Sequence, residues 1–309
     1  MSFLIIAPGL KVDSWIKQLR ALEPRLDLRV WPQVGDPDEI EFALTWNHPP
    51  GEFNQYKNLK CIASLGAGVD HILRDPALPA SVPVTRVVEA SMAQSMSEYI
   101  LLSVLNYCRH LHAYHKDQSR RKWQPRVPLP AHKIRIGILG LGQLGADAAR
   151  KLCHLGFQVG GWSRTSRKIP GVSTFAGNEA LDNFLSQTNI LICLLPLTPA
   201  TEGILNLTTF AKLPAGAYVI NAARGAHLVE KDLLKALETG QISGACLDVF
   251  QIEPLPEDHP FWDHPQIVVT PHISSLTYPK AVAPQIVDNY NRVKSGKAPM
   301  HVVDIERGY

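Results

Sequence analysis

Three side chains suited to chemistry on a carbonyl group each come just after an apolar, strand-like segment. They are Arg224, Glu253 and His272. The carboxyl ends of parallel strands share one edge of a sheet, where ligands bind, so we expect these side chains to lie together. Taken singly, each has an ordinary alternative: Arg224 in a helix-face ion pair, Glu253 as an exposed loop acid, and His272 as a structural histidine.

Together, the three groups fit the reduction of a 2-oxo acid by hydride. Hydride transfer to a ketone carbon leaves negative charge on the carbonyl oxygen, and a protonated His272 can supply the proton that this oxygen needs. Glu253 at the other ring nitrogen would orient the imidazole and favour its charged form. The Arg224 fork would bind the adjacent carboxylate and polarise the carbonyl.

A glycine-rich turn at residues 140–145 supplies the position for a dinucleotide. An apolar run, 134–139, precedes it, and a segment with helical apolar spacing follows it. Of the three glycines, the first permits a tight turn, the second lets a pyrophosphate approach, and the third lets helix and strand pack. The predicted contacts along this turn are Gly140, Leu141, Gly142, Gln143, Leu144 and Gly145.

The end of the next predicted strand indicates which dinucleotide is used. An NAD site normally has an acidic residue about 20 residues beyond the glycine turn. Here the strand 158–162 is followed by Ser163, Arg164 and Arg167 without an acid. Arg164 can grip a 2′-phosphate, with Ser163 as a further donor and Arg167 adding charge, so we predict that NADP(H) is preferred over NAD(H). The alternative is a solvated basic loop.

The order of apolar segments predicts two α/β units. Strand-like and helix-like segments alternate in both halves, which is typical of parallel sheets covered by helices. We expect a Rossmann-type cofactor domain, residues 98–280, inserted into a flavodoxin-like substrate domain, residues 1–97 and 281–309. The predicted strands are 3–7, 28–31, 42–46, 61–65 and 82–88 in the first unit, and 134–139, 158–162, 190–195, 217–221, 245–250 and 267–270 in the second.

Two helices connect these units in the prediction. A capping box of Ser91 and Gln94 starts a long helix that runs to Leu111, with an apolar stripe wide enough to bury most of its first half. The last helix closes at Gly296 and returns the chain to the first unit. We expect residues 301–309 to form only a tail.

Composition limits the remaining possibilities. A charge of +3 over 309 residues includes no basic tract that could follow a nucleic-acid backbone. The five cysteines lie in apolar segments without a CxxC, which predicts reduced core thiols and neither disulfides nor a metal site. Apolar runs are too short for a membrane span or a signal peptide. We therefore expect a soluble cytoplasmic protein.

A second glycine-bearing turn, at residues 64–70, follows a predicted strand of the first unit. Such a turn could present backbone N–H groups to an anion, but a tight turn without a ligand fits the local sequence equally well.

The motifs resemble those of the D-isomer-specific 2-hydroxyacid dehydrogenases along nearly the full chain. They are GLGQLG from Gly140, LLPLTPATEGILN from Leu194, NAARG from Asn221, LDVFQIEPLP from Leu247 and TPHIS from Thr270. Five motifs in the family's order are far more specific than any one of them.

The resemblance implies roles for particular residues. Arg224 would bind the substrate, His272 would be the acid/base and Glu253 its carboxylate partner. The amides of Ala67 and Gly68 would meet the substrate carboxylate. Coenzyme contacts would include Leu195, Pro196, Ala222, Met96 and Asp248, the last near the nicotinamide carboxamide.

Within the family, three features are similar to the glyoxylate/hydroxypyruvate reductase A branch: Trp46, the WSRTSRK segment from Trp162 and the terminal VDIERGY. This implies an NADP-linked homodimer that reduces small 2-oxo acids, with glyoxylate and hydroxypyruvate as first candidates. Trp46 would limit the group on C2, although it is equally well an ordinary aromatic at a strand end. The alternatives are a dehydrogenase of a bulkier 2-oxo acid and a cofactor-sensing, corepressor-like interaction protein.

Overall fold

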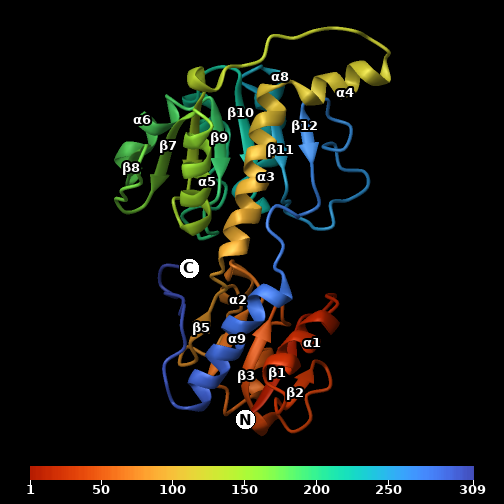
Figure 1. Cartoon of the computed structure of the whole chain (residues 1–309), viewed down its shortest axis with the longest axis vertical. Helices are drawn as coiled ribbons and strands as arrows, with labels where there is room; N and C mark the ends of the chain where they lie inside the picture. The colour runs from red at the N-terminus through yellow and green to blue at the C-terminus, as the bar shows by residue number, and fades with distance from the viewer. The chain divides into compact units, whose positions relative to one another are not determined.

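The computed structural model describes residues 1–309, and the chain divides into two compact units (Figure 1). Unit 1 comprises residues 1–91 and 277–309, and unit 2 comprises residues 92–276. Unit 2 therefore begins at residue 92 and ends at residue 276, where the sequence suggested 98 and 280.

Unit 1 is built on a five-stranded parallel sheet in the order β2-β1-β3-β4-β5. This is the flavodoxin-like order, which agrees with the fold class that the sequence predicted for this unit. The strands are apolar because they are covered on both faces. The elements are β1 (Ser2–Ile6), α1 (Asp13–Leu22), β2 (Leu28–Val30), β3 (Ile40–Thr45), β4 (Cys61–Ser64), α2 (Asp70–Leu73), β5 (Val84–Thr85) and α9 (Pro279–Lys294).

The last helix packs on one face of this sheet through an aromatic cluster. The ring of Phe3 stacks on that of Phe42 with centroids 5.0 Å apart, and Tyr290 of α9 meets both rings at 5.8 and 5.9 Å. Because these rings come from β1, β3 and α9, the two segments of unit 1 share one core.

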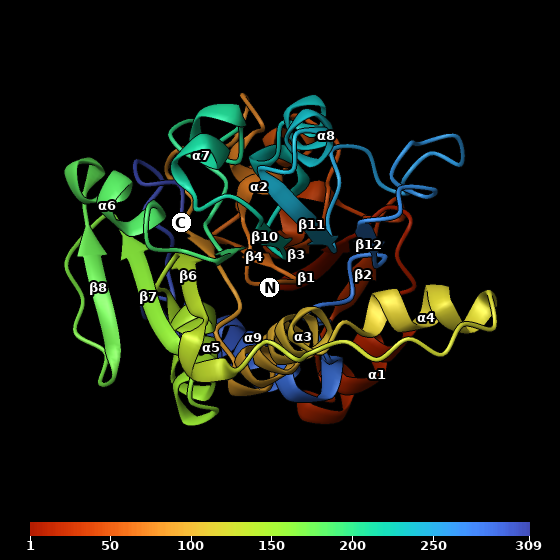
Figure 2. The same ribbon diagram turned by 90° about the horizontal axis from the view of Figure 1, so that it is seen from above.

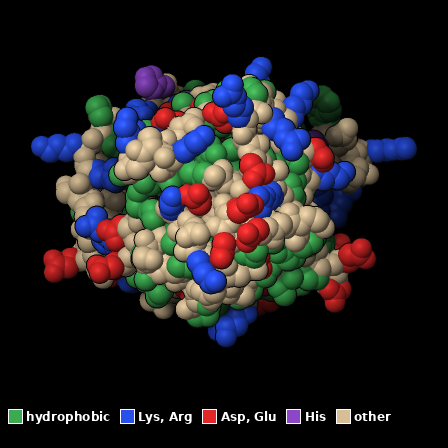
Figure 3. Space-filling view, turned by 90° about the horizontal axis from the view of Figure 1, so that it is seen from below, with side chains coloured by type: hydrophobic (Ala, Val, Ile, Leu, Met, Phe, Trp, Pro, Cys, Tyr) green, Lys and Arg blue, Asp and Glu red, His purple; other side chains and the backbone are tan.

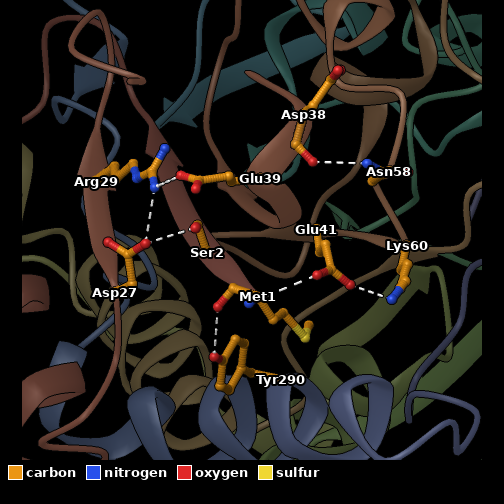
Figure 4. A network of polar contacts seen from close by, with 10 residues as sticks. All are labelled: Met1, Ser2, Asp27, Arg29, Asp38, Glu39, Glu41, Asn58, Lys60 and Tyr290. Carbon is orange, nitrogen blue, oxygen red and sulfur yellow. Dashed lines mark hydrogen bonds and ion pairs between the residues drawn. The ribbon is translucent and has the colours of Figure 1, made fainter. Parts of the chain in front are cut away.

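Ion pairs and hydrogen bonds lie at the amino ends of the strands of unit 1 (Figure 4). Arg29 of β2 bonds Asp27 at 3.0 Å and also pairs with Glu39, while Ser2 donates to Asp27 at 2.6 Å. The Tyr290 hydroxyl donates to the Met1 carbonyl at 3.0 Å. On the face seen in Figure 3, acidic and basic side chains likewise lie side by side. Exposed pairs of this kind add little stability each.

Unit 2 has a seven-stranded parallel sheet in the order β12-β11-β10-β9-β6-β7-β8. From β8 to β11 this is the Rossmann order, so the predicted fold class is confirmed. Helices α3 and α5 cover one face, and α6, α7 and α8 the other (Figure 2). The elements are α3 (Ala90–Cys108), α4 (Leu111–Ser119), β6 (Arg135–Leu139), α5 (Gln143–His154), β7 (Gln158–Ser163), β8 (Val172–Ala176), α6 (Leu181–Leu185), β9 (Ile190–Cys193), α7 (Leu207–Lys212), β10 (Ala217–Asn221), α8 (Glu230–Glu238), β11 (Ile242–Leu247) and β12 (Ile267–Val269).

Strand β8 and the start of α3 differ from the prediction. No sequence pattern indicated β8, because this edge strand is partly exposed along its whole length and has no continuous apolar run. The predicted capping box is wrong: the Glu89 carboxylate accepts from Ser91 N at 2.7 Å, and Gln94 instead donates to Glu98 at 2.6 Å. The first half of α3 carries the buried residues Met92, Met96, Ser97 and Tyr99, whereas Leu102 and Leu105 of its second half are exposed.

The C-terminal residues are not a loose tail. Val302 forms a bridge with Thr85, and Val303 N donates to the Val84 carbonyl at 2.8 Å. The buried Asn289 side chain of α9 bonds both the N–H and the carbonyl of Met300, at 2.7 and 3.1 Å. Residues 300–303 therefore cover the edge strand β5.

Candidate active site

The glycine turn after β6 has the shape of a phosphate cradle. Gly140 has φ +101°, which side chains seldom adopt, and a Cβ at Gly145 would lie 1.9 Å from the Gly140 carbonyl oxygen. Gly142 caps α5, no side chain bonds the helix N-terminus, and a Cβ on Gly142 would meet open space. The geometry thus fits a phosphate at the amides of this helix.

The predicted determinants of coenzyme choice follow β7. Ser163 is buried and its hydroxyl donates to the Thr165 carbonyl at 2.9 Å. In this structure the hydroxyl proton is therefore used in a hydrogen bond within the turn after β7. Arg164 and Arg167 are exposed beyond it. Both residues thus follow the carboxyl end of β7, the strand that pairs with β6 and lies next to its glycine turn.

The other predicted coenzyme contacts differ in accessibility. Leu195 and Pro196 follow β9, the strand on the other side of β6. Leu195, Ala222 and Met96 are each less than 10% exposed, and Met96 packs in the core between α3, α5 and the sheet. Any contact of Met96 with a coenzyme would therefore be made by a small exposed part of its side chain.

Arg224 and Glu253 come together because the loops that carry them touch. A Cβ on Gly225 would lie 1.9 Å from the Phe250 carbonyl carbon, so only glycine permits this approach of the two backbones. Nη1 of Arg224 donates to the Ala223 carbonyl at 2.7 Å. Glu253 accepts from Phe250 N at 2.9 Å through Oε1.

His272 joins Glu253 from the end of β12. Its Nδ1 is 2.7 Å from Glu253 Oε2, and about a third of each side chain is exposed. Burial raises the pKa of Glu253, but the hydrogen bonds from His272 and Phe250 N and the charges of His272 and Arg224 outweigh it and lower that pKa overall. The three side chains predicted from the sequence are thus assembled at one sheet edge.

Asp248 has a structural environment that its predicted role did not suggest. Its side chain is fully buried; Oδ1 accepts from Thr270 Oγ1 at 2.6 Å and from Ile273 N at 2.9 Å, and Oδ2 accepts from Ser274 N at 2.8 Å. Its carbonyl accepts from His272 N at 2.8 Å. Asp248 therefore holds the loop that carries His272.

Sequence reasoning missed two residues of this loop network, Thr270 and Tyr99. The Tyr99 hydroxyl of α3 lies 2.7 Å from Thr270 Oγ1. A tyrosine within an apolar helix stripe and a threonine two residues before His272 are weak signals, since nothing in either local sequence indicates the contact between them.

The remaining candidates, Trp46, Ala67 and Gly68, lie in unit 1. A Cβ on Gly66 would be 2.9 Å from Cζ3 of Trp46, so the indole lies directly over this turn. The Ser64 hydroxyl fixes the turn by accepting from Gly66 N at 3.1 Å and donating to the Gly68 carbonyl at 2.9 Å. The amides of Ala67 and Gly68 donate to no other group of the protein.

The chain has no grouping of three or more histidine, cysteine or acidic side chains that could hold a metal ion. Its five cysteines are all free, and burial raises the pKa of the Cys61 thiol to about 12 and that of Cys108 to about 11. None of the helices combines the length and the apolar character needed to cross a bilayer.

The chain is similar to known proteins over its full length. The family model described as "D-isomer specific 2-hydroxyacid dehydrogenase, NAD binding domain" matches residues 101–274. Glyoxylate/hydroxypyruvate reductase A from Yersinia enterocolitica is 44% identical over 314 residues, and the one from Serratia proteamaculans 45%; both alignments cover all of each chain.

Solved structures agree over the whole chain. A D-isomer specific 2-hydroxyacid dehydrogenase from Xanthobacter autotrophicus in complex with NADPH has a TM-score of 0.94 at 42% identity, covering 100% of this chain and 99% of that one. An NADPH-dependent glyoxylate/hydroxypyruvate reductase from Sinorhizobium meliloti, in complex with NADP and sulfate, has a TM-score of 0.93 at 38% identity, covering both chains completely.

Proposed function

Because this chain belongs to the D-isomer specific 2-hydroxyacid dehydrogenase family, we propose that it reduces small 2-oxo acids with NADPH. Glyoxylate and hydroxypyruvate, the substrates in the names of its relatives, are the first candidates, giving glycolate and D-glycerate. The observation that carries the proposal is the His272–Glu253 pair with Arg224 beside it at the carboxyl edge of the sheet of unit 2.

The residues of unit 2 fit a dinucleotide phosphate. Gly140, Gly142 and Gly145 form the cradle at the start of α5, and Arg164 with Arg167 would bind the 2′-phosphate that distinguishes NADPH. NADPH supplies the hydride when it is bound. Neighbouring structures that contain NADPH or NADP support this choice of coenzyme.

The proton follows a path set by this chain's own residues. Glu253 holds His272 Nδ1, which directs Nε2 away from the carboxylate and toward a reacting carbonyl oxygen. Arg224 would bind the substrate carboxylate and stabilise the charge that develops on the carbonyl. His272 then gives its Nε2 proton to that oxygen, which yields the hydroxyl of the product.

Unit 1 would select the substrate. The amides of Ala67 and Gly68, which have no acceptor within the protein, would bind the substrate carboxylate. Trp46, packed over Gly66, would limit the group on C2 to a small one. This selection distinguishes the proposal from a dehydrogenase of bulkier 2-oxo acids.

A panel of 2-oxo acids tests the function. We expect the purified protein to oxidise NADPH with glyoxylate and hydroxypyruvate and to turn over branched or aromatic 2-oxo acids far more slowly. Preference for a bulky 2-oxo acid would support the second enzyme class, and tight NADPH binding without turnover of any acid would support a cofactor-sensing interaction protein.

We also infer a cytoplasmic homodimer. Leu102 and Leu105 of α3 and Leu111 of α4 have exposed side chains, and Trp123 in the segment after α4 is 99% exposed. The same surface of a second subunit would bury these apolar side chains in a dimer interface. Five unpaired cysteines fit a reducing compartment. A monomer in sedimentation at micromolar concentration would contradict the dimer.

A further inference from the structure

A buried polar chain links helix α3 to the loop that carries His272. It runs from the Tyr99 hydroxyl to Thr270 Oγ1 over 2.7 Å, and from Thr270 Oγ1 to Asp248 Oδ1 over 2.6 Å. Tyr99 is 9% exposed and Asp248 is fully buried. This series of hydrogen bonds therefore ends on the Asp248 carboxylate, which accepts from the amides of Ile273 and Ser274, the two residues directly after His272.

The number of available protons determines which group donates in each of these hydrogen bonds. A threonine hydroxyl has one proton, and Thr270 donates it to Asp248. Tyr99 must then donate to Thr270, since Thr270 has no second proton for the phenol oxygen. Burial raises the pKa of the Tyr99 phenol, so this proton is retained at all working pH values.

The loop needs such support because its backbone is unusual. His272 has φ +54°, a left-handed conformation that non-glycine residues rarely adopt. Asp248 holds this residue from both sides: its carbonyl binds His272 N at 2.8 Å, and its carboxylate binds the next two amides. Reorientation of the Asp248 carboxylate would therefore move the imidazole away from Glu253.

We propose that Tyr99 is a positioning residue for His272. Its hydroxyl directs Thr270 onto Asp248, and Asp248 in turn keeps the His272 imidazole against Glu253. The proposal rests on the proposed role of His272 as the proton donor. It places no contact between Tyr99 and the substrate.

Helix α3 offers a matched control eight residues further on. The Tyr107 hydroxyl lies 3.0 Å from Ser243 Oγ, and its ring stacks on Tyr218 with centroids 4.1 Å apart. Ser243 lies near the start of β11, whereas Asp248 follows the end of that strand. Tyr107→Phe thus removes a similar hydroxyl of the same helix without touching the His272 loop.

The test measures the rate of NADPH oxidation in a single turnover with saturating glyoxylate. We expect Tyr99→Phe to slow this rate about tenfold while the KM for glyoxylate changes less than about twofold, because the position of the imidazole is disturbed and Arg224 is not. Tyr107→Phe should keep the wild-type rate. Equal slowing in both variants, or a Tyr99→Phe rate within about twofold of wild type, would overturn the proposal.

Variants of Thr270 repeat the test without changing the helix. Thr270→Ser keeps the hydroxyl and should retain the wild-type rate, whereas Thr270→Val should lose at least as much as Tyr99→Phe. The double variant Tyr99→Phe/Thr270→Val should be no slower than Thr270→Val alone, because both act through one chain. Additive losses would refute that chain.

A parallel measurement on His272→Asn separates the two proposals. If His272→Asn retains wild-type activity, the proposed proton donor is wrong. If His272→Asn is inactive while Tyr99→Phe and Thr270→Val are unaffected, only the positioning role of Tyr99 is refuted.

Discussion

Nδ1 of His272 lies 2.7 Å from Oε2 of Glu253, and the other oxygen of the same carboxylate accepts from Phe250 N at 2.9 Å. Both oxygens are thus engaged, so the carboxylate cannot turn without breaking a bond. The net lowering of the Glu253 pKa keeps this group charged throughout the pH range in which an imidazole titrates. His272 therefore works beside a fixed negative charge.

Removing this charge should change the pH dependence of reduction. Glu253→Gln removes the negative charge beside the proton donor, so the fall of kcat/KM with rising pH should begin at a lower pH. The measurement is the pH profile of NADPH-dependent glyoxylate reduction. Glu230→Gln is a matched control, because Glu230 lies 3.3 Å from His259 outside the site. An unchanged profile for Glu253→Gln would show that its charge does not act on the proton donor.

Removing the imidazole itself should abolish most of the turnover. His272→Ala takes away the proton donor and should lower kcat ~10²- to 10⁴-fold, while NADPH binding, followed by fluorescence titration, stays intact. His259→Ala serves as the control and should keep normal kcat. Near-normal activity of His272→Ala would mean that another group protonates the product oxygen.

Coenzyme choice should depend on Arg164. A charge-assisted bond to a phosphate contributes about 1.5–3 kcal/mol, so Arg164→Ala should raise the KM for NADPH about tenfold to a hundredfold. The KM for NADH should scarcely change, since NADH lacks the 2′-phosphate. Arg135→Ala, which removes an exposed arginine at the amino end of β6, should affect neither. Equal use of both coenzymes by the unmodified protein would refute the assignment.

Trp46 should set the size of the substrate. Trp46→Leu removes the large ring over Gly66, so kcat/KM for a branched 2-oxo acid relative to glyoxylate should rise about tenfold or more. Trp31→Leu is a suitable comparison, because Trp31 also follows a strand of unit 1. If both variants keep the wild-type ratio, Trp46 is an ordinary packing residue.

The sequence was sufficient for the features that follow from local periodicity and from the geometry of parallel sheets. The two parallel α/β sheets and the meeting of Glu253 with His272 belong to this class, because the carboxyl ends of parallel strands lie on one edge of the sheet. Other features depend on partners far away in the chain. The Tyr99–Thr270 contact joins residues 171 positions apart, and a tyrosine in an apolar helix gives no indication of its partner. Strand β8 was missed because an exposed edge strand has little apolar pattern.

The pairing of residues 300–303 with β5 also determines the order in which the chain can mature during its synthesis. Unit 2 is one continuous stretch and can fold as soon as its own residues have left the ribosome. Residues 1–91 are made before unit 2, yet the ring of Tyr290 that packs on Phe3 and the segment that covers Thr85 are made after it. The nascent first segment therefore keeps its edge strand β5 uncovered until residues 290–303 have been synthesised.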